Sequence, residues 1–488
     1  MPAPKKARGR KAAPLIAARL NAQVALEAEA DGNVVARFGD YEQGLGKFSP
    51  ATLARLRQLR TGLPLGSIGG GRAAGKDIDL LIRRLAISGL LEYGFGSARG
   101  RDQVIIEPQM AEYWPKVSKV GNADTLALSR FAYLRRRGKE MVVESPRAGA
   151  LLRIADPKIA AALAALAQPQ KISRYRKERG FPGLELLGLL LDCQILFKLK
   201  PGDVDGLRPS EGDPDLVLWD FHDLLFHTRS THGRQANPIG GLYSYASVMP
   251  PLPAVRAPWP GKSVDLNMQP PPPAPSPFAE LLHERHSTRD FDDEHPITLA
   301  ELAAFLQTAA RIRAQWTSEA DPEHEGPQVT YATRPYPSGG AAYELELYLA
   351  VANCAGLASG FYHYDAGRHA LTLIETRPQE VEAQLSAAAF AIGAADLPQI
   401  LITMAARFGR VSWKYNSVAY SLILKDVGVL MQTLYLTAAD MGLGGCAIGT
   451  NDIDLFAQMT GLEFYVEGPV GQFALGRGRQ AVNGPAFG

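Results

Sequence analysis

The sequence predicts an α+β protein in which two small mixed modules precede a Pro-rich linker and a larger C-terminal domain of antiparallel-rich sheet and long helices. Three observations support this prediction. Strand pairs followed by helices are predicted twice before about residue 205. Prolines are concentrated between residues 249 and 277. Beyond them, an alternating run at 345–351 predicts a strand, and an apolar run at 417–441 predicts a long buried helix.

The first module begins with a hairpin. Apolar residues alternate at 24–28 and continue at 34–35 after an Asp-Gly turn signal. Ser49 is a candidate N-cap for a helix that starts at Pro50 and ends at Gly62. A second helix is predicted at 76–88, because its apolar residues recur at helical spacing. These are Ile78, Leu81, Ile82 and Leu85.

Two further strands close this module. Residues 90–93 and 104–106 flank a Gly-rich turn, as the wing of a winged helix does. A similar order follows at 141–143 and 151–154, with an Ala-rich helix from Asp156-Pro157, a helix at 184–191 and a strand at 196–199. The sequence therefore predicts a second, degraded winged-helix module.

The prolines set the domain boundaries. Such a density of proline forbids a packed helix and favours an extended spacer. The predicted parts are a disordered basic tail at 1–20, winged-helix modules at 21–115 and 125–205, a helix plus Pro-rich linker at 216–277, and the C-terminal domain at 278–488. His222 and His227 in the linker helix are interpreted as capping or interface residues, and no metal site is predicted.

Composition narrows the function classes. The net charge of +2 gives no long-range field that would require nucleic acid or an anionic membrane as partner. Three cysteines without metal-ligand spacing fit a reducing cytoplasm. The basic N-terminus lacks the apolar core of a secretory signal. The apolar run at 417–441 is interrupted by Lys425, Asp426 and Gly428, so it is interpreted as a core helix and not a membrane span.

Two basic clusters predict a phosphate-binding site. Arg285-His286-Ser287-Thr288-Arg289 and Arg477-Gly478-Arg479 provide guanidinium and hydroxyl donors, which match the oxygens of a phosphate monoester. Arg477 and Arg479 alternate in a predicted terminal strand, so both side chains could point to one face. Taken alone, the first cluster is more typical of a solvated surface turn than of a phosphate site.

These runs resemble motifs of the nitroreductase-like FMN flavoproteins. Pro337-Ser338-Gly339-Gly340 is similar to the loop under the flavin ring, and Gly442–Gly449 to a loop that offers backbone N–H groups to the flavin. The resemblance implies a homodimer with this set of FMN-binding residues: Arg285, His286, Ser287, Arg289, Pro337, Ser338, Gly339, Gly340, Gly444, Gly445, Cys446, Ala447, Arg477 and Arg479.

One branch of that superfamily fits best. Gly360–Asp365 and the pair Lys414-Tyr415 resemble the SagB-type dehydrogenases, the azoline oxidases of cyanobactin and microcin type. The chain departs from this branch at Glu344, where a proline is common. The resemblance implies oxidation of peptide thiazolines and oxazolines to thiazoles and oxazoles, with FMN as cofactor and oxygen as electron acceptor. The precursor's leader would bind the N-terminal modules, and a cyclodehydratase complex is a further candidate partner.

Tyr415 is the candidate catalytic base. An azoline ring carbon beside the carbonyl has an acidified proton, and its removal prepares hydride transfer to the flavin. The Lys414 cation would favour the charged form of the neighbouring phenol. Alternatively, Lys414 lies on the surface and Tyr415 caps the following helix, and His363 is then a substitute acid–base group.

Two other functions remain open from the sequence. The protein could be an NAD(P)H-dependent nitro or quinone reductase, since the flavin motifs alone do not name the substrate. It could also be a flavin-bearing regulator whose winged helices bind DNA through arginines such as Arg55 and Arg57. The linked flavin domain favours peptide over DNA as the ligand of the modules.

Overall fold

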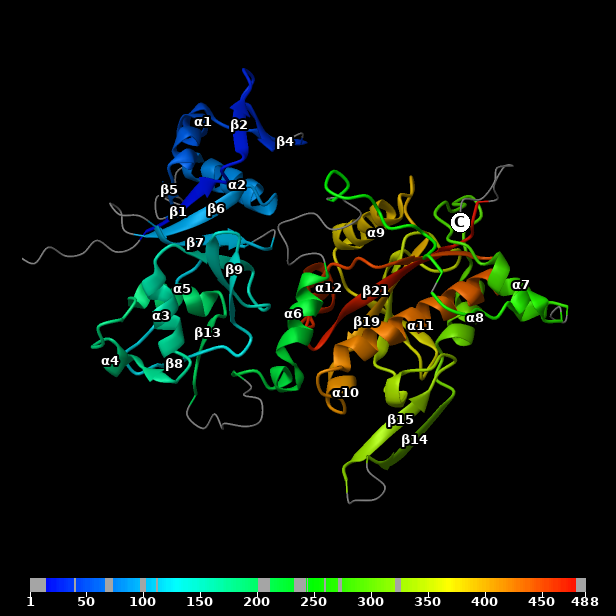
Figure 1. Ribbon diagram of the computed structural model, residues 1–488. Helices are drawn as coiled ribbons and strands as arrows, with labels where there is room; N and C mark the ends of the chain where they lie inside the picture. The colour runs from blue at the N-terminus through cyan, green and yellow to red at the C-terminus, as the bar shows by residue number, and fades with distance from the viewer. Residues whose placement is uncertain are drawn as a thin grey trace, which may run out of the picture. The chain divides into compact units, whose positions relative to one another are not determined.

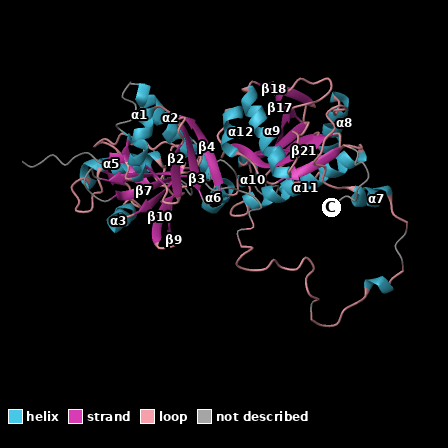
Figure 2. Cartoon of the chain, turned by 90° about the horizontal axis from the view of Figure 1, so that it is seen from above, coloured by secondary structure: helices cyan, strands magenta, loops and turns pink. Residues whose placement is uncertain are grey.

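The structure is a computed structural model that describes residues 15–38, 41–65, 73–96, 102–110, 113–200, 211–231, 243, 245–258, 260–270, 274–320 and 326–479. The chain divides into two compact units, Met1–Pro238 and Ile239–Gly488. Each unit has helices packed on antiparallel sheet and a hydrophobic core of its own (Figures 1 and 2).

The strands of the first unit are β1 (Leu15–Leu20), β2 (Val24–Ala28), β3 (Asn33–Phe38), β4 (Tyr41–Lys47), β5 (Leu63–Pro64), β6 (Leu91–Gly96), β7 (Asp102–Pro108), β8 (Thr125–Leu128), β9 (Tyr133–Arg137), β10 (Glu140–Glu144), β11 (Ala150–Ile154), β12 (Gln170–Lys171) and β13 (Leu196–Lys198). Its helices are α1 (Pro50–Arg55), α2 (Ala73–Ile87), α3 (Pro157–Ala165), α4 (Ile172–Tyr175), α5 (Leu184–Asp192) and α6 (Phe221–Arg229), with 3-10 turns η1 (Leu56–Arg60) and η3 (Pro214–Leu218).

The local predictions for this unit are largely confirmed. β2 and β3 form the predicted hairpin, and β6 pairs with β7 on either side of the predicted wing turn, whose residues 97–101 lie outside the described residues. The apolar stripe of α2 is completely buried. Asp156 caps α3 by accepting the Lys158 N–H. Ser49 precedes α1 as predicted but makes no capping bond, because its hydroxyl lies 3.1 Å from the Thr52 hydroxyl.

The two predicted modules are not separate bodies. One seven-stranded sheet, in the order β5-β1-β6-β7-β11-β10-β9, contains strands from both, and a single core cluster extends from Ala18 to Leu196. The junction is the β7–β11 pair, in which Val104 lies opposite Ile154. The predicted tail at 1–20 also needs correction. Leu15–Leu20 is strand β1, paired with β6, and only residues 1–14 lie outside the described part.

The second unit contains α7 (Pro277–Glu284), α8 (Leu299–Ala309), α9 (Pro378–Ile392), α10 (Gly409–Ser412), α11 (Ala419–Asp440) and α12 (Ile453–Thr460), with 3-10 turns η4 (Leu266–Met268) and η5 (Gly339–Ala341). Its strands are β14 (Ala314–Glu319), β15 (Gln328–Thr333), β16 (Leu345–Val351), β17 (Gly360–Asp365), β18 (Ala370–Ile374), β19 (Ile400–Arg407), β20 (Gly444–Ile448) and β21 (Glu467–Gly476). The main sheet has the order β18-β17-β16-β19-β21-β20 and every pair is antiparallel.

Helices cover both faces of this sheet. α9 and α12 contribute Leu385 and Phe456 to a core with Tyr348 of β16. α11 lies on the other face, where the Tyr435 ring packs edge-on against Phe473 of β21 (Figure 1). Of the described helices, α11 is the one whose length and mean hydropathy of 1.3 would allow it to cross a membrane, and it packs instead against β20, β21 and α8.

Two sequence predictions for this unit are wrong in detail. The run Gly442–Gly449, predicted as a loop, contains strand β20, because residues 444–448 pair with β21. The terminal strand ends at Gly476, so Arg477 and Arg479 lie beyond it and do not alternate on one sheet face. The Pro-rich linker is extended as predicted. Its described residues form no α-helix or strand, and most of their side chains are exposed (Figure 2).

Candidate cofactor and catalytic site

The two basic clusters predicted from the sequence lie side by side. Asp292 N–H donates to the Arg477 carbonyl at 2.9 Å, and Arg479 N–H donates to the Asp290 carbonyl at 3.0 Å. Phe291 and Gly478 form the β-bridge between these bonds. The structure thus joins segments nearly two hundred positions apart, as a shared phosphate site requires.

Tyr435 of α11 links this region to β20. Its hydroxyl lies 2.9 Å from the Ser287 hydroxyl and accepts the Ala447 N–H at 2.8 Å. The Arg285 guanidinium lies over the same ring, 5.2 Å from its centroid. Thr288 N–H donates to the Gly445 carbonyl at 2.8 Å, which fixes the segment after Ser287 against β20. The Ala447 N–H, predicted to face a flavin, is therefore used within the protein.

The four arginines of the two clusters have different partners. Arg285 and Arg289 form no ion pair with the described residues, so their charges are available to an anion. Arg479 donates to the Phe291 carbonyl at 3.2 Å, and its ion-pair contacts are long, 3.5 Å to Asp290 and 3.9 Å to a second exposed carboxylate. Arg477 instead donates to both carboxylate oxygens of Glu301 at 2.7 and 2.8 Å. Arg477 is thus held by an internal ion pair, which the predicted phosphate role did not foresee.

The glycines of β20 serve internal packing. A Cβ on Gly444 would come within 2.5 Å of Thr288, and one on Gly445 within 2.3 Å of Phe473. Cys446 points to the opposite face, into the core with α9 and α12. Glycine is required here because the β20 backbone approaches its own neighbours closely. Their predicted role toward a cofactor stays a prediction.

A second cluster forms where the loop at 338–340 meets α11. The Ser338 hydroxyl donates to Asp426 Oδ2 at 2.9 Å, and Gly339 N–H donates to both Asp426 oxygens at 3.1 and 2.9 Å. Asp426, which interrupts the apolar run of the helix in the sequence, is 6% exposed. Its carboxylate therefore ties the predicted ring-binding loop to α11.

The predicted catalytic pair lies against the same loop. Lys414 and Tyr415 occupy the irregular turn between α10 and α11, and the Lys414 Nζ lies 5.4 Å from the Tyr415 ring centroid. A Cβ on Gly340, whose φ is +59°, would lie 2.3 Å from the Tyr415 hydroxyl and 2.9 Å from the Lys414 Nζ. The Tyr415 hydroxyl and the Lys414 amine thus lie close together beside Gly340, where glycine leaves room for them, and their catalytic role stays a prediction.

A buried carboxyl pair lies beneath this loop. Glu344 directly precedes β16 and is fully buried, and its Oε2 lies 3.3 Å from the Ser338 hydroxyl. Burial, and then the charge of Asp426, raise the pKa of Glu344 from 4.5 to about 7. The sequence marked Glu344 only as a departure from its branch, and nothing in the local pattern indicated the pairing with Asp426.

His363, the alternative acid–base group, lies elsewhere. It lines a cavity of about 560 Å³ together with Glu346, Tyr348 and Glu467, and that cavity includes neither Tyr415 nor the loop at 338–340. Its Nε2 is 3.5 Å from a Glu346 oxygen, and the Tyr348 hydroxyl donates to Glu467 at 2.6 Å. Burial raises the pKa of Glu467. The structure thus separates His363 from the pair Lys414-Tyr415.

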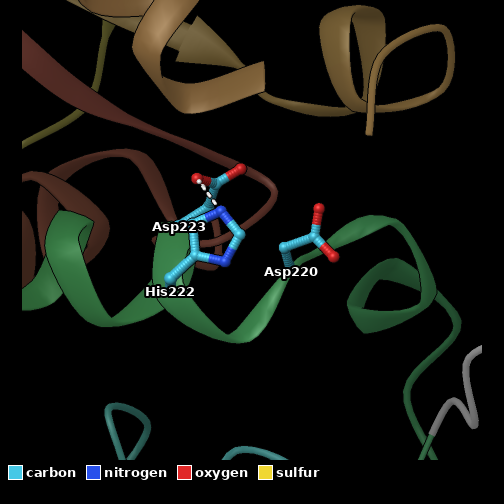
Figure 3. Close-up of side chains that lie close together, drawn as sticks. All are labelled: Asp220, His222 and Asp223. Atoms are coloured by element: carbon cyan, nitrogen blue, oxygen red, sulfur yellow. Dashed lines mark ion pairs between the residues drawn. The ribbon is translucent and has the colours of Figure 1, made fainter. Parts of the chain in front are cut away.

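Asp220, His222 and Asp223 come together at the start of α6 in the first unit (Figure 3). Their ligand atoms lie within 4.8 Å of one another, and His222 Nε2 is 3.3 Å from an Asp223 oxygen. The three residues are near neighbours in sequence at one helix terminus, and this grouping alone does not identify a metal site. His227 is buried and stacks on Trp219 within the first unit, and the predicted capping or interface role of the two histidines stays a prediction.

The donor set of the first cluster fits a phosphate-bearing ligand. Two arginines without carboxylate partners among the described residues flank a serine hydroxyl, and Arg479 approaches from the tail. Guanidinium groups are the usual partners of phosphate oxygens. Sequence analysis missed Tyr435, because a tyrosine within an apolar helix carries no sign of what it contacts.

Comparison with known proteins gives one match within each of the two compact units. Residues 282–477 match the nitroreductase family model, and residues 126–236 match the model of the cyanobactin oxidase ThcOx. A protein of Methanocaldococcus jannaschii named as a nitroreductase is 28% identical over 170 residues, which cover 35% of this chain and 77% of that protein.

Two solved structures are also similar. The Escherichia coli microcin synthetase McbBCD complex with truncated pro-MccB17 bound contains a chain that is 20% identical, with 55% of this chain and 97% of that chain covered and a TM-score of 0.36. A protein of Ralstonia eutropha described as a nitroreductase is 21% identical, with 46% and 98% covered and a TM-score of 0.30. Since these TM-scores are low, the family assignment depends on the matched models.

Proposed function

We propose that this chain, an oxidoreductase that carries a nitroreductase-family domain, oxidises peptide thiazolines and oxazolines to thiazoles and oxazoles, with FMN as cofactor and oxygen as electron acceptor. The observation that carries the proposal is the meeting of the Lys414 amine and the Tyr415 hydroxyl at Gly340. The cyanobactin oxidase match at residues 126–236 of the same chain supports this substrate class over a nitro compound or a quinone.

The first cluster would hold the cofactor's phosphate. Arg285, Arg289 and Arg479 provide guanidinium donors and Ser287 a hydroxyl, and a charge-assisted bond of this kind contributes about 1.5–3 kcal/mol. Two or three such bonds would retain a cofactor without covalent attachment. When bound, FMN would supply the two-electron acceptor that the reaction needs.

In its phenolate form Tyr415 would accept the acidic ring proton of the substrate and become the neutral phenol. The Tyr415 side chain is half-buried, so its oxygen is accessible to a ligand while the loop at 338–340 fixes its position. The exposed Lys414 amine meets the same point, where a positive charge stabilises the oxygen that takes up the proton. The small Gly340 keeps this point free of a competing side chain.

The placement of the two clusters favours a homodimer. Asp426 and Tyr435 are nine positions apart on α11, which is about 2.5 turns, so they lie on opposite sides of the helix. A single ligand that contacts both the phosphate cluster and the loop at 338–340 would have to pass around α11. A second copy could supply the missing cluster on each side, so each site would be completed by the partner.

The first unit would bind the precursor's leader. The three-stranded sheet β2-β3-β4 has β2 and β4 as edge strands, and edges of this kind accept an extended peptide as an additional strand. A cavity of about 690 Å³ lies beside it, lined by residues that include Phe38, Gln43 and Leu90. The leader would then hold the azolines near the second unit, and a cyclodehydratase would supply them.

The decisive measurement is the mass of an azoline-containing precursor after incubation with the protein and oxygen. A loss of two hydrogens per ring is expected. Rapid bleaching of the bound flavin by NAD(P)H, with no change in peptide mass, would favour the reductase alternative. A gel shift with DNA tests the regulator alternative.

Variants of the catalytic pair test the assigned roles. Tyr415→Phe and Lys414→Ala should each retain FMN and reduce azole formation by about 10²- to 10⁴-fold, the usual range for a lost general base. The double variant should be little worse than either single variant, because the two groups act as a unit. Tyr362→Phe, which loses a hydroxyl bonded to the Ala358 carbonyl, is the matched control. Near-normal turnover by Tyr415→Phe would remove this base assignment.

A further inference from the structure

Glu344 and Asp426 form a carboxyl pair with a serine hydroxyl between them. The Ser338 Oγ lies 2.9 Å from Asp426 Oδ2 and 3.3 Å from Glu344 Oε2. Both carboxyl groups are buried, with 0% of Glu344 and 6% of Asp426 exposed. Two ionised carboxylates that are both buried away from water would repel each other strongly, so one of the two carboxyl groups must carry a proton.

Counting hydrogens assigns that proton to Glu344. Asp426 accepts the Gly339 N–H and the Ser338 hydroxyl, as a carboxylate does. The Ser338 hydroxyl has one hydrogen, and its shorter contact is the one with Asp426. The contact with Glu344 is therefore made by a proton on Glu344. Its other oxygen, Oε1, is buried and has no hydrogen-bond partner among the described residues, which is less costly for a neutral acid than for an anion.

The groups around the pair agree with one proton on Glu344. Asp426 faces Glu344 from α11, and Arg410 faces it from α10, but the Arg410 guanidinium donates to the Ala342 and Thr330 carbonyls. The buried Tyr336 phenol also faces it, and burial raises the pKa of Tyr336. Burial and Asp426 raise the pKa of Glu344 to about 7. Arg410 is the cation among these neighbours, and its charge favours an ionised Glu344, but burial and the charge of Asp426 outweigh it.

The loop held by this chain of hydrogen bonds is strained. Gly340, Ala341 and Tyr343 have φ values of +59°, +54° and +46°, a region that residues with side chains seldom adopt. Tyr343 N–H donates to Ser338 Oγ at 3.0 Å, so the same serine closes the loop. Tyr415 and Lys414 rest on Gly340. The position of the catalytic pair thus depends on the carboxyl pair beneath it.

We propose that Glu344 is a positioning residue that carries a proton in the native protein and, through Ser338 and Asp426, holds the loop at 338–343 beneath Tyr415 and Lys414. Loss of the proton places two anions on either side of Ser338, and the loop opens. The link to catalysis depends on the proposed function, but the protonation and its effect on the loop do not.

Hydrogen–deuterium exchange of the full chain tests this directly. The amides of Gly339 and Tyr343 are protected only while the loop is closed. The wild type, Glu344→Gln and Ser338→Ala are compared from about pH 6 to about pH 9, with the intrinsic exchange rate divided out. Glu380→Gln on α9, where Glu380 pairs with Arg377, is the matched control. Infrared spectra report the protonated carboxyl separately.

The wild-type loop should lose protection above about pH 7, by up to tenfold per pH unit, and the control should behave likewise. Glu344→Gln, which is neutral at every pH and keeps a donor, should remain protected throughout. Ser338→Ala should be unprotected at every pH. The carboxylic-acid band should be absent from Glu344→Gln. A pH-independent wild-type loop, or a Glu344→Gln loop that opens as the wild type does, would overturn the proposal. Neither readout uses substrate, so failure to oxidise azolines leaves this result intact.

Discussion

Replacing Tyr435 with phenylalanine tests how the cofactor cluster is assembled. The substitution keeps the ring under Arg285 and against Phe473, and it removes only the hydroxyl that contacts Ser287 and accepts the Ala447 N–H. One hydrogen bond contributes about 0.5–1.5 kcal/mol net, and an unpaired donor costs about 1–3 kcal/mol. Because Tyr435 is half-buried and water can reach part of the site, a loss of about 1–2 kcal/mol in unfolding free energy is expected.

FMN affinity should also fall. The Tyr435 hydroxyl orients Ser287 toward the proposed phosphate site, so its loss frees the serine and weakens binding by about fivefold to tenfold, equivalent to about 1–1.4 kcal/mol. The assay is quenching of FMN fluorescence by the apoprotein, with thermal unfolding measured in parallel. Tyr364→Phe is the control. Tyr364 lies on β17, away from the cluster, and its hydroxyl is 2.8 Å from His369 Nδ1.

The two variants should therefore differ in one respect. Both should lose stability, and only Tyr435→Phe should lose affinity for FMN. Equal FMN affinity in both variants would refute the argument that Tyr435 prepares Ser287 for the phosphate, and would leave Tyr435 as a purely structural contact between α11 and β20.

Three further predictions concern other parts of the chain. Replacing both Arg285 and Arg479 with alanine should yield a folded protein without bound flavin, whereas Arg477→Ala should mainly reduce stability because it breaks the ion pair with Glu301; flavin content after purification checks both. Removing Met1–Pro238 should leave flavin bound and impair a full precursor far more than a short leaderless azoline; equal losses would assign the first unit a structural role. The raised pKa of Glu344 means that, as pH rises, the unfolded chain releases this proton before the folded chain does. The free energy of unfolding should therefore fall between about pH 4.5 and about pH 7, by at most about 3 kcal/mol. Denaturant titrations of Glu344→Gln should lack this pH-dependent fall.

The sequence by itself determined the elements whose stability comes from near neighbours. The stripe of Ile78, Leu81, Ile82 and Leu85 predicts α2 because helical spacing places these residues on one face. The strand predicted at 345–351 is β16 as observed, and the helix predicted at 417–441 is α11 within two residues at each end. The nitroreductase motifs were also readable, and the family model matches residues 282–477.

Only the tertiary structure decided how these elements combine. No local pattern indicates that β7 would pair with β11 and join two predicted modules in one sheet, because strand partners are chosen by long-range register and burial. Residues 444–448, within the predicted loop, form strand β20 because they pair with β21, which the local sequence does not indicate.

Charge pairing is equally non-local. Arg477 binds Glu301, 176 positions away, and Asp426 meets Glu344 and Ser338 from a different part of the chain. A sequence shows which residues can ionise, but burial and distance determine which of them carry a proton or a partner. For this reason the sequence indicated that the two basic clusters lie together, and their role toward a phosphate stays a prediction, while the carboxyl pair beside Ser338 became visible only in the folded chain.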